Sequence, residues 1–467
     1  MQSGNGGLSP VLNRIDENLA DSLMRVFELV RIPSISTDPA HAGDCRRAAE
    51  WLVAELDLLG FDASLRDTPG HPMVVAHHDG PSPDAPHVLF YGHYDVQPVD
   101  PIDLWESDPF DPRVKDGPNG AKIITGRGIA DDKGQLMTFV EACRAYKEVN
   151  GELPCRVTIL FEGEEESGSP SLKPFLKANA DELKADFALV CDTSMWDPET
   201  PAISTGLRGL VGEEITVQAA DRDLHSGYFG GAAANPIHVL AKVLADIHDD
   251  DGAVTIPHFY EGVEETPREI LDQWEGLGQT ADKFLGEIGL SIPSGEKGRS
   301  VLELTWARPT AEVNGITGGY TGEGFKTVIA ARASAKVSFR LVGKQDPEAI
   351  RGNFRDFVKA RIPADCSVSF HEHGGSPGIQ LPYDSPVLQK AKEALSDEWP
   401  KPAVMIGMGG SIPVVGDFQT MLGMESVLVG FGLSDDRIHS PNEKYALKSF
   451  HKGQRSWARI LAALAAD

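Results

Sequence analysis

Short apolar runs alternate with longer amphipathic ones along much of the chain. The apolar runs are nearly continuous, which is typical of strands covered on both faces of a sheet; they lie at 87–93, 157–162, 187–192 and 426–431. Amphipathic runs with the spacing of helices lie at 16–30, 43–59, 133–149 and 171–180. This alternation predicts an α/β sheet with parallel members, in which ligands bind beyond the carboxyl ends of the strands.

The pattern changes between about residues 206 and 373. Strand-like segments at 212–219, 335–342 and 366–371 flank helical ones at 235–248 and 347–362, an order that favours a compact α+β insert. The α/β pattern then resumes with a helix at 385–395 and ends with an amphipathic helix at 445–465. We therefore expect one domain made of residues 1–205 and 376–467, interrupted by a second domain at 206–375. The stretch at 252–300 has no motif that we can interpret.

Composition narrows the class of protein. The 467 residues are 41% hydrophobic and 24% charged, as in a folded soluble protein. The formal net charge of −27 repels phosphate backbones and anionic lipid surfaces, and we find no apolar run long enough to span a bilayer. We expect neither a nucleic-acid partner nor a membrane partner.

The first residues and the cysteines indicate a compartment. The first seven residues carry no basic and no apolar segment of a secretory signal, so we expect a cytoplasmic protein. Five widely separated cysteines without a CxxC pair predict buried thiols, not disulfides or thiolate metal ligands: Cys45, Cys143, Cys155, Cys191 and Cys366.

Ionisable residues follow the predicted strands. His93 and Asp95 alternate after the first apolar run, two aspartates open the helix at 133, and three glutamates follow the second run. Each motif alone also fits capping or an exposed loop. Together with Asp192 and His439 they form a nitrogen and oxygen ligand set that suits a pair of divalent ions. Two bridged ions lower the pKa of a bound water and polarise a carbonyl, which predicts amide hydrolysis.

These motifs resemble those of the dinuclear zinc metallopeptidase family that includes carnosinase, cytosolic nonspecific dipeptidase, aminoacylase, glutamate carboxypeptidase and succinyl-diaminopimelate desuccinylase. The segments that carry the resemblance occur in the family order along nearly the whole chain: 92–98, 126–134, 164–169, Asp192 and 438–443. The resemblance implies a zinc-exopeptidase-like catalytic domain with a mostly parallel central sheet. The insert would be an α+β, ferredoxin-like lid and dimerisation domain.

The resemblance also implies roles for individual residues. Two divalent ions per subunit, zinc or else manganese or cobalt, would be held by His93, Asp131, Glu166, Asp192 and His439. Asp131 would bridge the ions and precede Asp132 across a cis peptide. Glu165 would be the general base, and Asp95 would orient His93.

The insert resembles the dipeptidase branch most. His225, in Asp-Leu-His-Ser-Gly, would reach the active site of the partner subunit in a homodimer and stabilise the oxyanion. Arg340 would pair with a free substrate carboxylate, next to the element that carries Thr327. His373 and Ser411 resemble further substrate contacts.

The leading functional hypothesis is a dizinc dipeptidase or related exopeptidase that uses attack by a metal-bridged hydroxide. An N-acyl-amino-acid deacylase of the acetylornithine deacetylase or desuccinylase type would use the same metals with a different acyl pocket. A metal-free binding protein built on the same fold is a third alternative. The exact substrate and its side-chain preference are not encoded in any motif that we can interpret.

Overall fold

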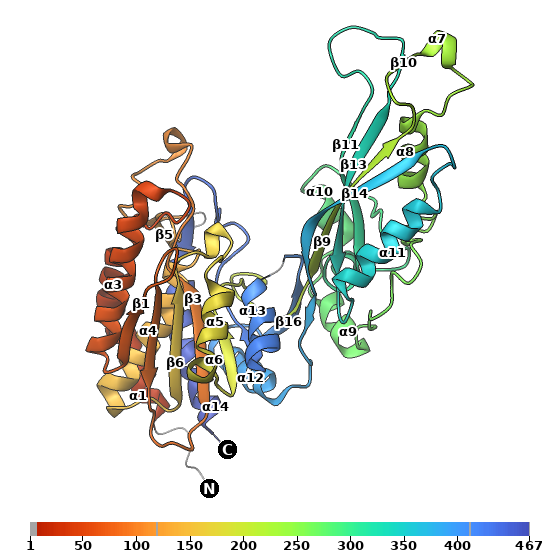
Figure 1. Cartoon of the computed structure of the whole chain (residues 1–467). Helices are drawn as coiled ribbons and strands as arrows, with labels where there is room; N and C mark the ends of the chain where they lie inside the picture. Colours follow the sequence, from red (N-terminus) through yellow and green to blue (C-terminus); the bar gives the residue numbers. More distant parts are fainter. Residues whose placement is uncertain (1–6, 118–119, 411, 467) are drawn as a thin grey trace. The chain divides into compact units, whose positions relative to one another are not determined.

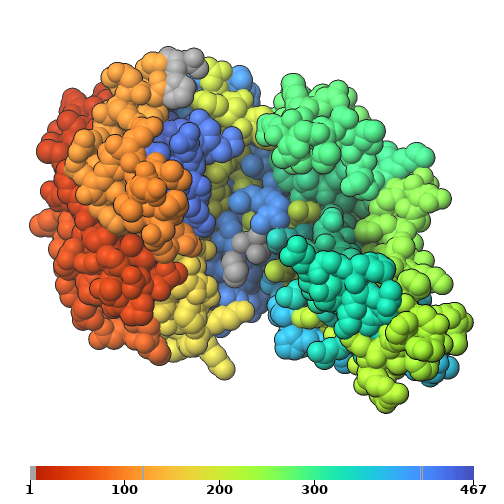
Figure 2. All heavy atoms as spheres, turned by 90° about the horizontal axis from the view of Figure 1, so that it is seen from above, coloured from red at the N-terminus to blue at the C-terminus, as the bar shows by residue number. Residues whose placement is uncertain are grey.

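The computed structural model describes residues 7–117, 120–410 and 412–466, and these residues form two compact units. The first unit contains the residues up to 204, then 381–405 and those from 417 onward. The second contains 205–380 and 406–416. Within the first unit, the C-terminal residues pack among N-terminal ones, as the blue and the red to yellow spheres of Figure 2 show.

A mixed sheet runs through the first unit in the order β1-β2-β6-β3-β7-β17-β8. The pairs β3 with β6, β3 with β7, and β17 with β7 are parallel, whereas β2 pairs antiparallel with both β1 and β6. The predicted α/β sheet with parallel members is therefore confirmed. The strands are β1 (Asp62–Arg66), β2 (Met73–His78), β3 (His87–His93), β6 (Arg156–Glu162), β7 (Phe187–Val190), β8 (Ala202–Leu207) and β17 (Glu425–Leu428).

Helices cover both faces of this sheet. In Figure 1, α5 and α6 lie in front of the strands, and α1, α4, α12 and α14 pack on one another. The stacked rings of Phe90 from β3 and Phe139 from α4, with Trp457 of α14 edge-on to both, form the centre of the core. The helices are α1 (Leu8–Glu17), α2 (Leu19–Val30), α3 (Ala42–Leu58), α4 (Lys133–Asn150), α5 (Leu172–Ala178), α6 (Ala180–Leu183), α12 (Pro386–Glu398) and α14 (Leu447–Ala465).

The first helical prediction needs a correction. The run predicted at 16–30 is α2, which begins at Leu19, and a separate helix α1 precedes it. Helix α1 buries Val11, Leu12 and Ile15, which have helical spacing. The sequence therefore contains the hydrophobic pattern of this helix, but over only a few residues.

A small antiparallel sheet accompanies the large one, with the strand order β18-β5-β4. Its strands are β4 (Arg113–Asp116), β5 (Lys122–Thr125) and β18 (Lys444–Ala446). Lys444 lies opposite Thr125, so this sheet joins the chain just before α14 to the chain just before α4.

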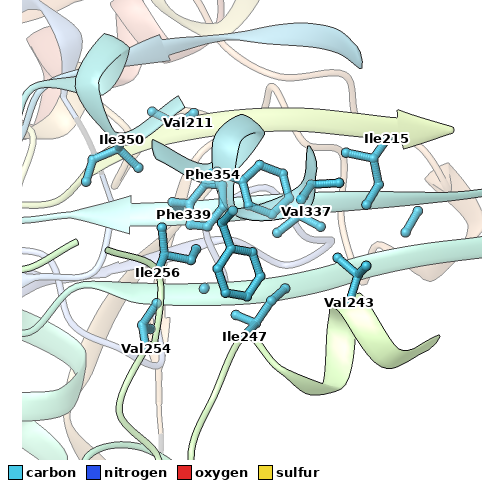
Figure 3. Close-up of a cluster of buried hydrophobic side chains, with 14 of the residues drawn as sticks. Val211, Ile215, Val243, Ile247, Val254, Ile256, Val337, Phe339, Ile350 and Phe354 are labelled. Atoms are coloured by element: carbon cyan, nitrogen blue, oxygen red, sulfur yellow. The ribbon is translucent and has the colours of Figure 1, made fainter. Parts of the chain in front are cut away.

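The second unit contains a four-stranded antiparallel sheet in the order β11-β13-β9-β14. With α8 after β9 and α11 before β14, this is the ferredoxin-like arrangement that was expected. Alternate residues of β9 and β13 are buried, including Val211, Ile215 and Phe339, so α8 and α11 cover one face of the sheet (Figure 3). The elements are α8 (Pro236–Ala245), α11 (Pro347–Lys359), β9 (Gly209–Gln218), β11 (Thr310–Gly318), β13 (Arg332–Leu341) and β14 (Ser367–Ser376).

Further elements complete the second unit. The stretch at 252–300 holds two short helices, α9 (Arg268–Gly276) and α10 (Ala281–Gly286). A two-stranded ribbon precedes a single helical turn; its parts are β10 (Leu224–His225), β12 (Val328–Ile329) and α7 (Ser226–Phe229). The end of β8 pairs with β15 (Ile379–Gln380), and β16 (Val404–Met408) also pairs with β8 and precedes α13 (Pro413–Asp417).

Residues 406–416 cluster with the second unit, although the sequence pattern assigned them to the first domain. The Thr205 hydroxyl donates to the carbonyl of Ile406, and Gly407 lies so close to Trp306 that no Cβ fits there. These local contacts have no signature in hydrophobic periodicity.

No helix in the described ranges is both long enough and apolar enough to cross a bilayer. The cysteines are free thiols, as predicted, although Cys366 is only partly buried.

Glu398 is a buried carboxylate that joins α12 to α14. It accepts hydrogen bonds from Arg455 and Lys452 at 2.8 Å on one oxygen and from Arg459 at 2.8 Å on the other. Burial raises the pKa of Glu398, but these three cations outweigh burial and lower the pKa below its ordinary 4.5. Its stabilising effect is thus present above pH 4.5 and is lost as the pH falls through the lowered value.

We expect Glu398→Gln to lower the free energy of unfolding by about 3 kcal/mol at pH 7, because three cations lose their charged partner. Urea unfolding at pH 7 and at pH 4 measures this loss, which should shrink at the lower pH. Glu393→Gln, an exposed change on the same helix, is the control. Equal losses at both pH values would contradict the ionic explanation.

Candidate metal centre

The predicted ligands of the first unit come from loops that follow neighbouring parallel strands. His93 ends β3, Glu165 and Glu166 follow β6 in a single 3-10 turn, and Asp192 follows β7. Because β3 lies between β6 and β7 in parallel register, these side chains meet at one edge of the sheet.

The ligand atoms form two groups that share Asp131. One group contains His93, Asp131 and Asp192, and the other contains Asp131, Glu166 and His439. His93 Nε2 lies 3.0 Å from Asp131 Oδ1, and His439 Nε2 lies 3.0 Å from Asp131 Oδ2. The two oxygens of one carboxylate therefore face different imidazoles, as a bridging ligand requires.

The electrostatics of the site fit bound cations. Burial raises the pKa of Asp192 well above its ordinary value, and the neighbouring charges of Asp131 and Asp132 raise it further. Hydrogen bonds to Asp131 and Glu166 raise the pKa of His439 to about 10. Divalent ions between these imidazoles and carboxylates would neutralise the repulsion among the carboxylates. The donor set, imidazole nitrogens with carboxylate oxygens, suits zinc and similar ions.

Asp131 lies at the end of a glycine-rich loop just before α4. The peptide bond between Asp131 and Asp132 is cis, as the family resemblance implied. Asp132 is fully buried and accepts a hydrogen bond from the backbone N–H of His93 at 3.2 Å. Asp132 therefore connects the end of β3 to the start of α4.

The three consecutive glutamates have different environments. Glu164 is buried and accepts the backbone N–H groups of His71 at 2.8 Å and Ser171 at 3.0 Å, so it anchors the loop. Glu165 is half-buried, and burial raises the pKa of its carboxyl. The Glu166 side chain, 3% exposed, points to His439 with Oε2 at 3.1 Å from Nε2.

Asp95 contacts both His93 and the glutamate loop. Its Oδ1 lies 3.4 Å and its backbone carbonyl 3.2 Å from Nδ1 of His93, the ring that Asp95 is predicted to orient. Its carboxylate also accepts the backbone N–H groups of Glu165 at 3.3 Å and Glu166 at 3.0 Å. One buried carboxylate therefore aligns a histidine and the glutamate turn.

Gln97 contacts a predicted ligand, and the sequence analysis did not single it out. Its Nε2 donates to Glu166 Oε2 at 2.8 Å, on the oxygen that also faces His439. Its position in the sequence could have indicated this contact. Gln97 follows Asp95 by two residues, and in extended backbone the side chains of residues two apart point to the same side of the chain.

The other predicted site residues lie in the second unit. His225 is exposed, and its Nδ1 accepts the backbone N–H of Gly227 at 2.9 Å, which leaves Nε2 turned away from this bond. Strand β10 pairs with β12, and the N–H of Ser226 donates to the carbonyl of Thr327. His225 and Thr327 are therefore neighbours.

Arg340 and His373 lie on different strands of the four-stranded sheet. Arg340 is half-buried on β13, and His373 on β14 has Nε2 3.4 Å from Glu214. The sequence analysis did not single out Arg208, a half-buried residue whose charge interacts with that of Arg340. Burial and the charge of Arg340 lower the pKa of Arg208 to about 10. Ser411 lies outside the described residues.

We expect Gln97→Ala to weaken metal binding about tenfold, because Glu166 loses the donor that fixes its carboxylate. Competition with a chromogenic chelator measures the affinity of the purified protein. Gln389→Ala removes a comparable amide that donates to the carbonyl of Tyr383 in the same unit, and it should leave the affinity unchanged. An unchanged affinity in Gln97→Ala would contradict this role.

Known proteins are similar in sequence to nearly the whole of this chain. The model of Peptidase family M20/M25/M40 matches residues 89–463. A relative from Schizosaccharomyces pombe, Cys-Gly metallodipeptidase dug1, is 32% identical and aligns over 97% of each chain.

Solved structures share the fold. Human carnosine dipeptidase 1 has a TM-score of 0.75 at 26% identity and covers 99% of this chain and 100% of its own. The family M20 metallo-carboxypeptidase Sso-CP2 from Sulfolobus solfataricus has a TM-score of 0.78 at 28% identity and covers 95% and 99%. These matches, with the ligand groups at the sheet edge, show that the chain belongs to peptidase family M20 and is a metallopeptidase.

Proposed function

We propose that this metallopeptidase hydrolyses the peptide bond of free dipeptides with two zinc ions held by His93, Asp131, Glu166, Asp192 and His439. The observation that carries the proposal is the pair of ligand groups that share Asp131 beside the half-buried Glu165. Manganese or cobalt would fit the same nitrogen and oxygen donors.

Bound divalent ions would polarise the scissile carbonyl and lower the pKa of a water molecule. Glu165 would accept the proton of that water and deliver it to the leaving amine. Its raised pKa suits this task, because a carboxylate of raised pKa accepts a proton more readily near neutral pH. Asp95 holds the backbone of Glu165, so the base is fixed relative to His93.

The dipeptidase proposal is favoured over N-acyl-amino-acid deacylation. The relatives that align over nearly their whole length include proteins named Cys-Gly metallodipeptidase and Beta-Ala-His dipeptidase. A free dipeptide differs from an acylated amino acid in its amino group, and it differs from a longer peptide in the short distance between that amine and the carboxylate. Arg340 would bind the carboxylate, with Thr327, His373 and Ser411 as further substrate contacts.

The proposal includes a cytoplasmic homodimer in which His225 completes the partner's active site. The exposed position of His225 supports this role, as does the Tyr228 side chain beside it, which is 82% exposed. Phe325, two residues before Thr327, is 92% exposed. The free thiols support a reducing compartment.

Substitution of each glutamate of the loop separates their roles. We expect Glu165→Gln to lower kcat by about 10² to 10⁴-fold with both metal ions retained, because only proton transfer is lost. Glu166→Gln should lose metal, and Glu164→Gln should lose mainly stability. Hydrolysis assays, metal analysis and thermal unfolding of the three variants measure these effects, and full activity in Glu165→Gln would refute the proposed mechanism.

Removal of the Arg340 charge tests the substrate class. We expect Arg340→Met to raise KM for free dipeptides about 10- to 100-fold, because a charge-assisted hydrogen bond pair is lost. C-terminally amidated dipeptides should be poor substrates of both forms. Arg332→Met, at the exposed opposite end of β13, is the matched control. If N-acetyl or N-succinyl amino acids were cleaved faster than dipeptides, the protein would be a deacylase.

A further inference from the structure

The loop that carries His439 has an unusual backbone. Arg437, His439 and Asn442 all have positive φ, at 57°, 61° and 64°. Residues other than glycine seldom adopt this left-handed region, and they keep it where the surrounding structure fixes it. The position of the His439 imidazole therefore depends on contacts that hold this loop.

Glu443 ends this loop and contacts the loop that carries Asp131. One carboxylate oxygen accepts a hydrogen bond from Arg127 Nη1 at 2.8 Å and another from the backbone N–H of Gly128 at 3.0 Å. The other accepts the N–H groups of Ala130 at 2.9 Å and Asp131 at 3.3 Å. Glu443 is fully buried, so these bonds form without competition from water.

Arg127 is itself fixed. Arg127 is 1% exposed, and its Nη2 donates a hydrogen bond to the carbonyl of Pro98 at 3.0 Å. Its guanidinium group lies 5.4 Å from the centre of the Trp105 ring. A single buried ion pair thus joins three segments: the one after β3, the one before α4 and the one before α14.

Two further contacts join the His439 loop to the Asp131 loop: the His439 imidazole lies 3.0 Å from Asp131 Oδ2, and the N–H of Gly126 donates to the backbone carbonyl of Glu443 at 3.2 Å. The remaining side-chain contacts of the His439 loop lead elsewhere. Asp436 pairs with Lys444 at 2.7 Å and accepts the N–H of Leu433, both within the same segment. Asn442 contacts the backbone of Leu104 and Glu106. The pairing of β18 with β5 holds Lys444 opposite Thr125, whereas the amides of Gly128, Ala130 and Asp131 are held by the Glu443 carboxylate.

We propose that Glu443 is a positioning residue that sets the spacing between Asp131 and His439, and so determines the affinity of the metal site that these two ligands share with Glu166. This inference rests on the proposed metal centre. Glu443 lies four residues after one ligand and accepts the amide of the other, so its displacement moves both ligands at once. Its carboxylate does not belong to either ligand group.

The test compares Glu443→Gln and Glu443→Asp with the wild-type protein. Both variants, prepared metal-free, are titrated with zinc against a chromogenic chelator, and their cobalt forms are examined by visible absorption. We expect one of two bound ions to weaken by about 10- to 100-fold, with a changed cobalt spectrum. Glu443→Asp keeps the charge next to Arg127 but shortens the side chain. It therefore provides a second folded variant for the comparison if Glu443→Gln fails to fold.

Glu398→Gln is the control for a purely structural effect, because it also removes a buried carboxylate from its cations in the same unit. It should lose stability and keep both metal affinities and the cobalt spectrum. Wild-type affinities and spectrum in folded Glu443→Asp would overturn the inference about Glu443. A wild-type protein that binds no zinc would instead overturn the proposed function.

Discussion

The arrangement of the first unit depends on the gathering of like charges at one edge of its sheet. Asp131, Asp192 and Glu166 lie in two adjacent groups of ligand atoms, in which the imidazoles of His93 and His439 face the carboxylates. Buried carboxylates at such distances repel one another strongly, because the surroundings screen them poorly. Parallel strands that end side by side bring the charges together, and bound cations are the physical means of keeping them ionised.

A second set of acidic residues holds the first in place. Asp95, Glu164 and Glu443 are buried, and each accepts at least one backbone N–H from a segment that is distant in sequence. A carboxylate that accepts several amides stabilises irregular backbone that no helix or strand would hold. Acidic residues of this site therefore fall into two groups, the predicted metal ligands and the anchors of the loops that carry them.

Much of this was predictable from the sequence. The apolar runs located β3, β6 and β7 because strands buried on both faces have a strong signal, and the residues after those strands were the predicted ligands. The anchoring residues were harder to predict. Glu443 and Gln97 were part of known motifs, but their contacts join segments far apart in the chain, and periodicity carries no information about such pairs.

The same limit explains the remaining differences. Helix α1 has a single buried stripe over ten residues, and the segment at 406–416 joins the second unit through contacts to Thr205 and Trp306. Both depend on packing partners that only the folded chain provides. Local propensity is a weak guide where tertiary contacts decide the outcome.

The interrupted order of the first unit has a consequence for biosynthesis. Strand β17, which lies between β7 and β8 in the sheet, helix α14 and His439 all follow the second unit in the chain. During translation, the segments before residue 205 must wait, with part of their apolar surface uncovered, until more than two hundred further residues have left the ribosome. The second unit can fold during that delay, whereas the nascent first unit is the part that would engage chaperones.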